Sequence, residues 1–281
     1  MPLPSPARRA GLVALALAAL AAPAAAGPWT RDAGGLYVKL SEGVFFADEY
    51  VDPTGAAADD VAYLGATTAL YAEIGLADGL QLALYLPHVL ARNSYDATGD
   101  RYLSFGGGDG RLGVQYSPRI TPFPAAVRVE AKVPMYDVAE PGGPEHALFP
   151  ARGDGQLDVD LWLSVGGSLD AVPLYGFVEV GHRVRTALYP GDGATLDYAD
   201  GLVAYAQAGY TVWRGILLAA NAQAVVPYAD DGRTKGYATV GPSVYAPVAA
   251  GWAVELYYDA TVWARAASRG QTAILGVSYS R

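Results

Sequence analysis

The sequence predicts an all-β protein, a transmembrane antiparallel up-and-down β-barrel of about twelve strands. Three features of the chain support this fold: an N-terminal export signal, repeated segments in which apolar and polar residues alternate, and connections that are alternately short and long. Beyond residue 26, no stretch approaches the roughly 20 apolar residues that a membrane-spanning helix needs. Strands would therefore have to cross the bilayer.

The first 26 residues have the organisation of a secretory signal peptide. Arg8 and Arg9 form a short positive region, residues 10–22 are apolar, and small residues lead to a cleavage position expected after Ala26. A membrane anchor is the alternative, but the apolar run is too short to span a bilayer. We therefore predict a signal peptide over residues 1–26 and a single barrel domain over residues 27–281.

The composition narrows the chemistry and the partners. The chain has no cysteine, which excludes disulfides, thiolate metal sites and a cysteine nucleophile. Its net charge of −9 would become −11 once Arg8 and Arg9 leave with the signal peptide. An acidic protein repels nucleic acid, so we expect no nucleic-acid partner.

Twelve segments carry the period of two that is typical of β-strands. The pattern is clearest over residues 125–135, where alanine and valine alternate with Arg128, Glu130 and Lys132. It is equally regular over four further segments and weaker over the rest. In chain order the predicted strands are residues 35–46, 65–76, 80–87, 110–117, 125–135, 156–165, 174–186, 201–213, 216–226, 236–247, 252–262 and 271–280.

The connections between these segments alternate in length. The short ones are residues 77–79, 117–123, 167–173, 213–215 and 248–251. The long ones are residues 47–64, 92–108, 136–154, 187–200, 228–235 and 264–270. Short periplasmic turns and longer outer loops are characteristic of outer-membrane barrels, and this order places both termini on the periplasmic side.

One face of the strands carries full charges at mid-strand, which is typical of the interior of a membrane barrel whose apolar face meets lipid. A soluble barrel is the alternative, with the ionic face in water and the apolar face as its core. Export, the lack of disulfides, the abundance of glycine and tyrosine and the strand lengths favour the membrane barrel. The residues predicted to line the lumen are Glu73, Arg111, Arg128, Glu130, Lys132, Asp158, Asp160, Glu179, Arg183, Arg185, Glu255 and Asp259.

Aromatic residues near the strand ends are suited to the two membrane interfaces, where a ring is half wet. They are Phe45, Phe46, Tyr116, Phe123, Tyr136, Tyr189, Tyr210, Trp213, Tyr228, Trp252 and Trp263. Ordinary enrichment of aromatics in strands is the alternative explanation.

Two descending strands begin with the same motif: Gly108-Asp109-Gly110 and Gly153-Asp154-Gly155. Such a motif permits a tight bend before pairing begins. The order of Leu86-Pro87-His88, the first motif, residues 127–134, the second motif and residues 181–185 resembles the outer-membrane transporters of the MetA-pathway of phenol degradation family, over about residues 60–190. The resemblance implies a barrel that takes up aromatic or other hydrophobic compounds, and it assigns no binding residue.

The charged faces of residues 125–135, 156–166 and 174–186 should be neighbours. Opposite charges across strands would form a salt-bridge ladder that fills and stiffens the barrel, or a polar constriction that selects permeants, and both can hold together. We expect no catalytic residue, cofactor or metal site, because His88, His146 and His182 do not share metal-ligand spacing.

Three functions remain open at this point. The favoured hypothesis is a monomeric outer-membrane channel for passive or facilitated diffusion of small solutes, hydrophobic or aromatic ones included. The second is a non-conducting barrel that acts through its acidic outer loops, which could bind lipopolysaccharide through divalent cations. The third, a lipid-active enzyme, would need a serine and a histidine together at the rim.

We expect no N-terminal plug, because only about eight residues separate the cleavage position from the first strand. Any plug should come from an inward-folded long loop, either residues 47–64 or residues 136–154.

Overall fold

The computed structural model describes residues 27–59, 61–118, 123–137, 139–143, 148–169, 171–189 and 198–281. The predicted signal peptide and His146 lie outside the described residues. The strands are β1 (Leu36–Val51), β2 (Ala57–Ala58), β3 (Val61–Ala77), β4 (Leu80–Tyr95), β5 (Arg101–Gly107), β6 (Asp109–Tyr116), β7 (Ala125–Pro134), β8 (Asp158–Leu169), β9 (Leu174–Arg185), β10 (Gly201–Trp213), β11 (Ile216–Pro227), β12 (Gly236–Ala249), β13 (Trp252–Arg265) and β14 (Ala267–Ser280).

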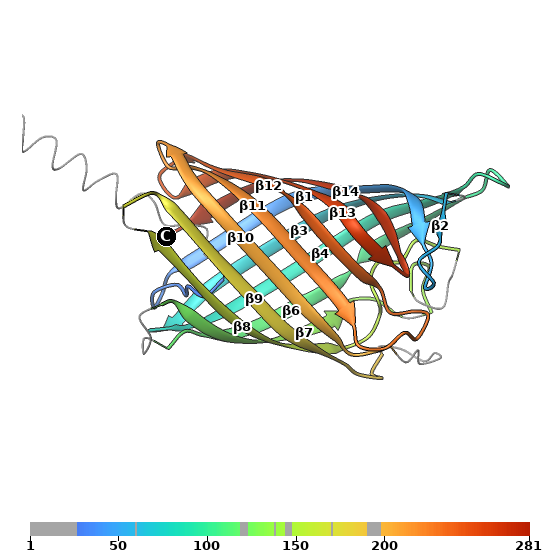
Figure 1. The fold of residues 1–281 in the computed structure, drawn as a ribbon, viewed down its shortest axis with the longest axis horizontal. Helices are drawn as coiled ribbons and strands as arrows, with labels where there is room; N and C mark the ends of the chain where they lie inside the picture. Colours follow the sequence, from blue (N-terminus) through green and yellow to red (C-terminus); the bar gives the residue numbers. More distant parts are fainter. Residues whose placement is uncertain are drawn as a thin grey trace, which may run out of the picture.

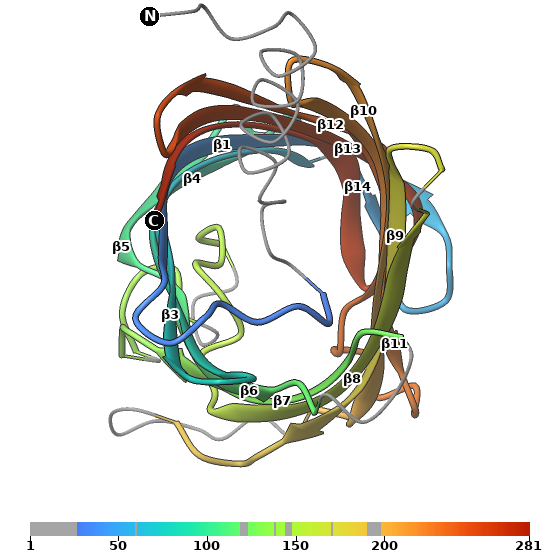
Figure 2. The ribbon, with the colours of Figure 1, turned by 90° about the vertical axis from the view of Figure 1, so that its left-hand side faces the viewer.

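The strands form one closed antiparallel barrel (Figures 1 and 2). Successive strands pair in chain order, and β14 returns to pair with β1 along most of its length. Fourteen strands occupy twelve positions in the wall, because β5 and β6 follow one another beside β4 and the short β2 pairs only with the end of β1. The predicted fold, an up-and-down barrel of twelve strands, is confirmed.

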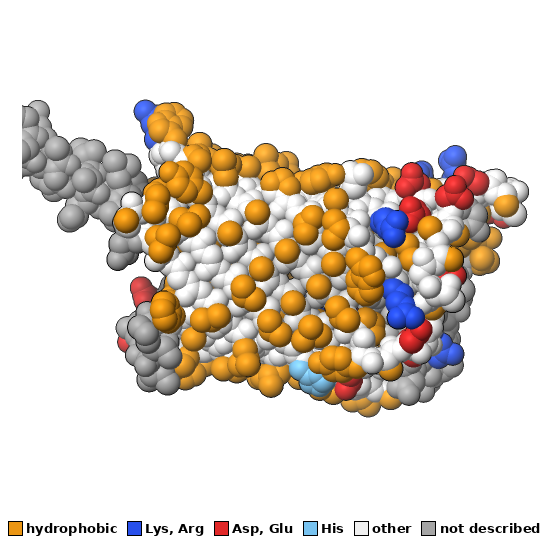
Figure 3. Space-filling view, in the orientation of Figure 1, with side chains coloured by type: hydrophobic (Ala, Val, Ile, Leu, Met, Phe, Trp, Pro, Cys, Tyr) orange, Lys and Arg blue, Asp and Glu red, His pale blue; other side chains and the backbone are white. Residues whose placement is uncertain are grey.

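The two faces of each strand have opposite chemistry. On β8, Leu161 and Leu163 are exposed on the outer surface, whereas Asp158 and Asp160 are buried inside. The outer surface carries a broad band of apolar side chains, with the charged groups gathered at the end that bears the long loops (Figure 3). This arrangement is the reverse of a soluble barrel, and it leaves an apolar surface that only lipid can cover. Among the described residues, no helix has the length and apolarity needed to cross a membrane.

The short turns follow the prediction. Arg214 and Gly215 join β10 to β11, and both have positive φ values of 47° and 78°. Two consecutive residues with positive φ match the right-handed twist of a hairpin, which explains the glycine at the second position.

Several outer connections are shorter than predicted. The loop expected over residues 264–270 is a tight turn at Ala266, between β13 and β14. The loop expected over residues 92–108 is largely a hairpin, since β4 continues to Tyr95 and β5 begins at Arg101. These strands continue beyond the apolar band, where both faces meet water and the alternation that reveals a strand fades.

Most of the predicted interfacial aromatics are exposed near strand ends, for example Tyr116, Trp213 and Trp252. Tyr136 is an exception, because it is buried inside the barrel with the guanidinium of Arg152 above its ring. Its position close to a strand end made it resemble an interfacial residue, but the loop that follows it turns inward.

Candidate functional site

The barrel interior holds the candidate site, and the strand register decides which charges meet there. The charges predicted for the lumen lie as follows: Glu73 on β3, Arg111 on β6, Arg128, Glu130 and Lys132 on β7, Asp158 and Asp160 on β8, Glu179, Arg183 and Arg185 on β9, and Glu255 and Asp259 on β13. Most of them are buried or half-buried, and the greater number sit on the four consecutive strands β6 to β9.

Cross-strand ion pairs connect β7, β8 and β9. Lys132 lies opposite Asp158, with its Nζ 2.6 Å from Oδ2, and Asp158 in turn lies opposite Arg185. One pair further along the same strands, Asp160 accepts two hydrogen bonds from Arg183, at 2.8 and 2.7 Å. Asp158 and Asp160 are 0% and 1% exposed. Burial of a carboxylate is costly unless cations and hydrogen-bond donors surround it, and the register provides both here.

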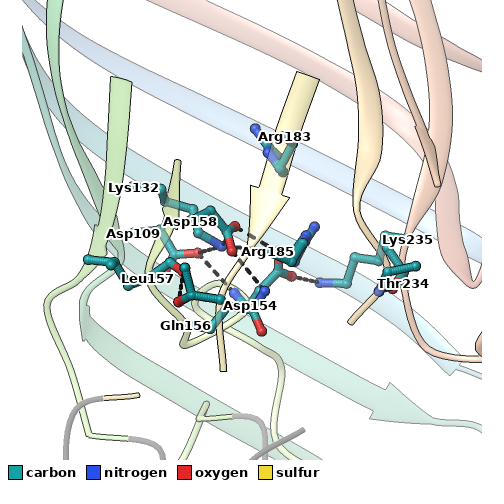
Figure 4. Close-up of polar contacts among 12 residues, drawn as sticks. Asp109, Lys132, Asp154, Gln156, Leu157, Asp158, Arg183, Arg185, Thr234 and Lys235 are labelled. Atoms are coloured by element: carbon teal, nitrogen blue, oxygen red, sulfur yellow. Dashed lines mark hydrogen bonds and ion pairs between the residues drawn. The ribbon is translucent and has the colours of Figure 1, made fainter. Parts of the chain in front are cut away.

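Above this ladder, five side chains form what we call the outer ionic cluster: Asp109, Lys132, Asp154, Arg185 and Lys235 (Figure 4). Asp154 is at its centre, 2.9 Å from Arg185 and 3.4 Å from each of the two lysines. Burial by itself would raise the pKa of Asp154, but these three cations together hold it well below its usual range.

The two Gly-Asp-Gly motifs meet in this cluster. The backbone N–H of Asp154 donates to the carboxylate of Asp109 at 2.9 Å. A side chain at Gly153 would collide with that carboxylate, since a Cβ there would lie 2.4 Å from its atoms. The repeated Gly-Asp-Gly motif was the feature of the sequence that marked the contact between Asp109 and Asp154. From the sequence we interpreted the two motifs only as local bends.

The loop between β7 and β8 turns into the barrel from the outer end (Figure 2). Ser104 on β5 donates to the carbonyl of Pro150 at 2.5 Å, and Arg152 pairs with Glu140 at 2.6 Å. Gln156 is fully buried and donates to Asp158 at 2.7 Å. Of the two loops named as a possible plug, it is therefore the described part of residues 136–154 that folds inward.

The N-terminal segment, residues 27–35, also lies inside the barrel, at the periplasmic end (Figure 2). Arg31 pairs with Glu73 at 2.9 Å, Gln115 donates to the carbonyl of Gly27 at 2.9 Å, and the ring of Trp29 packs edge-on against Phe177. We expected any plug to come from a long loop, because this segment is too short to form one. The segment nevertheless enters the lumen. An extended chain covers roughly 3.3–3.6 Å per residue, so even a few residues reach across a barrel of this size.

Between the periplasmic end and the outer ionic cluster lies a cavity of about 470 Å³, which we call the tyrosine cavity. Six tyrosines line it: Tyr37, Tyr71, Tyr175, Tyr205, Tyr245 and Tyr257. The charged groups in its wall are Lys39, Glu73, Glu255 and Asp259. It borders the N-terminal segment, because Trp29 packs against Tyr175 and Arg31 lies over the ring of Tyr37. The interior is thus divided between an ionic half, on β6 to β9, and an aromatic half, whose tyrosines lie on β1, β3, β10, β12 and β13 and at the start of β9.

The interior shows no arrangement typical of a metal centre. Within the part of the chain that the structure describes, no three His, Cys, Asp or Glu side chains are grouped so as to hold a metal ion. His182 is exposed on the outer surface, where its ring stacks on Tyr228.

Comparison with solved structures identifies barrels of the same fold. An outer-membrane channel from Pseudomonas putida F1 matches with a TM-score of 0.71 and 13% sequence identity, over 92% of this chain and 99% of that one. The NanC porin matches with a TM-score of 0.52 and 9% identity, over 86% of this chain and 98% of the porin. No family model and no curated protein matches the sequence. These likenesses concern the fold. A closed barrel with an apolar outer surface belongs in the bacterial outer membrane.

Proposed function

We propose that the protein is a monomeric channel through which small solutes, hydrophobic or aromatic ones included, cross the outer membrane by passive or facilitated diffusion. The observation that carries this proposal is the tyrosine cavity, which lies inside a closed barrel between two inward-folded segments. A surface-recognition barrel has no need of an internal cavity with aromatic and polar walls. The likeness in fold to the channel from Pseudomonas putida F1 supports the same function.

The preference for aromatic solutes rests on two arguments. The six tyrosine rings provide flat apolar faces and hydroxyl groups, which suit a ring that carries one polar substituent. The resemblance of the Gly-Asp-Gly segments to the phenol-degradation transporters points the same way. In this proposal nine of the twelve charged residues predicted for the lumen, those on β6 to β9, give its other half a polar, ionic wall. Glu73, Glu255 and Asp259 lie in the wall of the tyrosine cavity, and no residue has a catalytic role.

A non-conducting barrel is the second candidate, and one observation favours it. The N-terminal segment and the β7–β8 loop both lie within the interior, and each is fastened by a buried ion pair or hydrogen bond. If neither segment moves, the path stays closed. The acidic outer loops would then be the functional surface, with lipopolysaccharide or a divalent cation as the partner.

Reconstitution into planar lipid bilayers separates the two candidates. The purified protein is expected to give discrete single-channel conductance steps, small compared with those of an open sixteen-stranded porin because the interior is partly filled. If a preparation of folded barrel shows no conductance steps in bilayers, the channel function is refuted and the surface-recognition function is supported. Liposome swelling with phenol and with glucose as solutes then tests whether aromatic solutes pass faster.

A further inference from the structure

The carboxylates of the barrel interior differ in whether they form an ion pair with a cationic side chain. Seven of the twelve charged residues predicted for the lumen are acidic, and six of these seven form an ion pair. The partners are Arg31 for Glu73, Arg111 for Glu130, Lys132 for Asp158, Arg183 for Asp160, Arg128 for Glu179 and Lys39 for Glu255. Asp259 forms no ion pair with any lysine, arginine or histidine among the described residues.

Asp259 is buried as deeply as its paired neighbours. It is 6% exposed and lies in the wall of the tyrosine cavity. The hydroxyl of Tyr257 donates to its Oδ1 at 2.9 Å, and the hydroxyl of Thr239 lies beside the carboxylate. Hydroxyl donors offset part of the lost hydration, but a buried carboxylate still favours a nearby positive charge strongly. A cation that enters the cavity therefore meets a site where the protein supplies the counter-charge.

The rings around Asp259 determine which cation suits the cavity. A small metal ion needs several oxygen ligands that converge, and no such group of carboxylates occurs among the described residues. An ammonium group that carries carbon substituents can instead contact a carboxylate and aromatic faces together. The protein's own cations already contact tyrosine rings at the edge of the cavity. Arg31 lies 4.9 Å from the ring centre of Tyr37, and Lys39 lies 5.9 Å from that of Tyr71.

We propose that the tyrosine cavity binds a small organic ammonium ion, with its charge beside Asp259 and its carbon groups against the tyrosine rings. The proposal rests on the proposed function, because a channel brings the solute to the cavity, and it adds a charge preference to the general expectation of small solutes. The cations of the ionic half are already neutralised by their own carboxylates. Organic cations should therefore be retained at Asp259 rather than repelled.

The first test compares two solutes of the same shape that differ only in charge. Choline and 3,3-dimethyl-1-butanol are suitable, because a quaternary nitrogen in one replaces a quaternary carbon in the other. Isothermal titration calorimetry on the purified protein in detergent is expected to show choline binding at least tenfold more tightly. Equal affinities for the two solutes would overturn the proposal. So would loss of choline binding in equimolar sodium chloride, because that would show only a general attraction of cations.

The second test removes the charge. Asp259→Asn is expected to lower the affinity for choline tenfold or more and to leave the affinity for the neutral solute unchanged. Glu42→Gln is the matched control, since Glu42 faces the outer surface and should leave choline binding as it is. Unchanged choline affinity in folded Asp259→Asn would overturn the proposal. If that variant does not fold, Tyr245→Leu, which removes one ring of the cavity wall, should still weaken choline severalfold.

These measurements stand apart from the test of the proposed function. Calorimetry detects binding whether or not solute crosses the barrel, whereas bilayer conductance detects passage whether or not choline binds. Conductance without selective choline binding would refute the ammonium site alone. Choline binding without conductance would refute the channel and leave a ligand-binding barrel.

Discussion

At the scale of single residues, the exposure of the side chains decides how much an ion pair contributes to the stability of the barrel. Lys132 and Lys235 each lie 3.4 Å from Asp154, yet the side chain of Lys132 is 3% exposed and that of Lys235 is 45% exposed. Lys132 also neutralises Asp158, whose carboxylate is fully buried. If Lys235 is removed, water can solvate its partner, whereas water has little access to the carboxylates around Lys132. Two ion pairs of equal length should therefore contribute very differently to the stability of the barrel.

Lys132→Met is expected to destabilise the barrel by about 3–5 kcal/mol, because it leaves buried carboxylates without their nearest cation. Lys235→Met, the matched control, should cost only about 0–1 kcal/mol. Guanidinium unfolding in detergent, followed by tryptophan fluorescence, measures both. Similar losses for the two variants would show that burial does not control the strength of these pairs.

Glu42 differs from the paired carboxylates of the interior, because it lies on the outer surface of β1. Its neighbours on that face, Leu40 and Val44, are exposed to lipid, and the hydroxyl of Thr68 donates to its Oε2 at 2.5 Å. A carboxyl group within the apolar band is costly, although less so than a lysine or arginine.

We therefore expect Glu42→Val to stabilise the barrel by about 1–2 kcal/mol in lipid vesicles. Glu49→Gln is the control, because Glu49 is paired with Arg269 at the outer end. A loss of stability in Glu42→Val would mean that this carboxyl has a partner in the membrane.

At the scale of elements, the loops and the N-terminal segment set the state of the interior. The strands form a wall whose backbone groups are satisfied by pairing, so the wall is stable without either inward-folded part. Before Gly34, the N-terminal segment is fixed by a few side chains, chiefly Arg31, Trp29 and Gln115, rather than by strand pairing. Elements held by few contacts open most easily, and this segment is therefore the expected gate at the periplasmic end.

Trp29→Ala combined with Arg31→Gln should release the N-terminal segment and raise the single-channel conductance severalfold. The barrel should keep its stability, because the contacts between strands are unchanged and because release of the segment admits water to Glu73, the carboxylate that loses Arg31. Glu42→Gln, on the outer surface, is expected to conduct like the unaltered protein. Equal conductance in all three proteins would show that the segment does not limit passage.

The loop between β11 and β12 carries a pH-dependent contact. Asp231 accepts hydrogen bonds from the backbone of Ala199, Arg233 and Thr234, and one from the hydroxyl of Thr234. Partial burial acts to raise the pKa of Asp231, but these hydrogen bonds, those from Thr234 first, lower it to about 2. A folded-state pKa below the ordinary value means that the contact stabilises the loop above about pH 4, and that this stabilisation is lost as the pH falls toward 2.

We expect the amide of Thr234 to lose protection from hydrogen exchange as the pH falls from 4 toward 2, after correction for the intrinsic exchange rate. Mass spectrometry of a peptide that covers residues 228–235 measures the change. In Asp231→Asn the group does not titrate, so the corrected protection should stay constant over this range. A pH dependence that persists in Asp231→Asn would assign the effect to another group.

At the scale of the whole molecule, closure of the barrel explains both surfaces. Pairing of β14 with β1 closes the wall, so the chain does not need a partner strand to complete it. The ionic face, enclosed by that closure, is neutralised in pairs except at Asp259, and the apolar face is left for lipid.

The purified protein should therefore stay in solution only with detergent or lipid, and as a monomer. Light scattering combined with a refractive-index measurement gives the mass of the protein part of the detergent complex. A protein that is soluble and folded without detergent would contradict the assignment of the apolar face to lipid. A stable dimer in detergent would show that part of the outer surface contacts a second copy.

The sequence by itself determined the kind of fold and the chemistry of its two surfaces. A period of two is a local property, so residues 125–135 alone show which side chains share a face with Arg128 and Lys132. The connections, also local, indicated an up-and-down order, which the antiparallel pairing of successive strands confirms. That both termini are periplasmic stays a prediction. The twelve charged positions were named from this pattern. The pairs of Lys132 with Asp158 and of Arg183 with Asp160 follow from opposite signs on neighbouring strands.

Tertiary structure decided which groups meet in the interior. That Asp154 joins Lys132 and Lys235, and that Asp259 stays without a counter-ion, depends on strand register around the whole circumference and on a loop that enters from one end. The entry of the N-terminal segment depends in the same way on the space that closure leaves. Local patterns carry no information on such distant contacts, because a side chain's partners across a lumen are set by the closed wall and not by its neighbours in sequence.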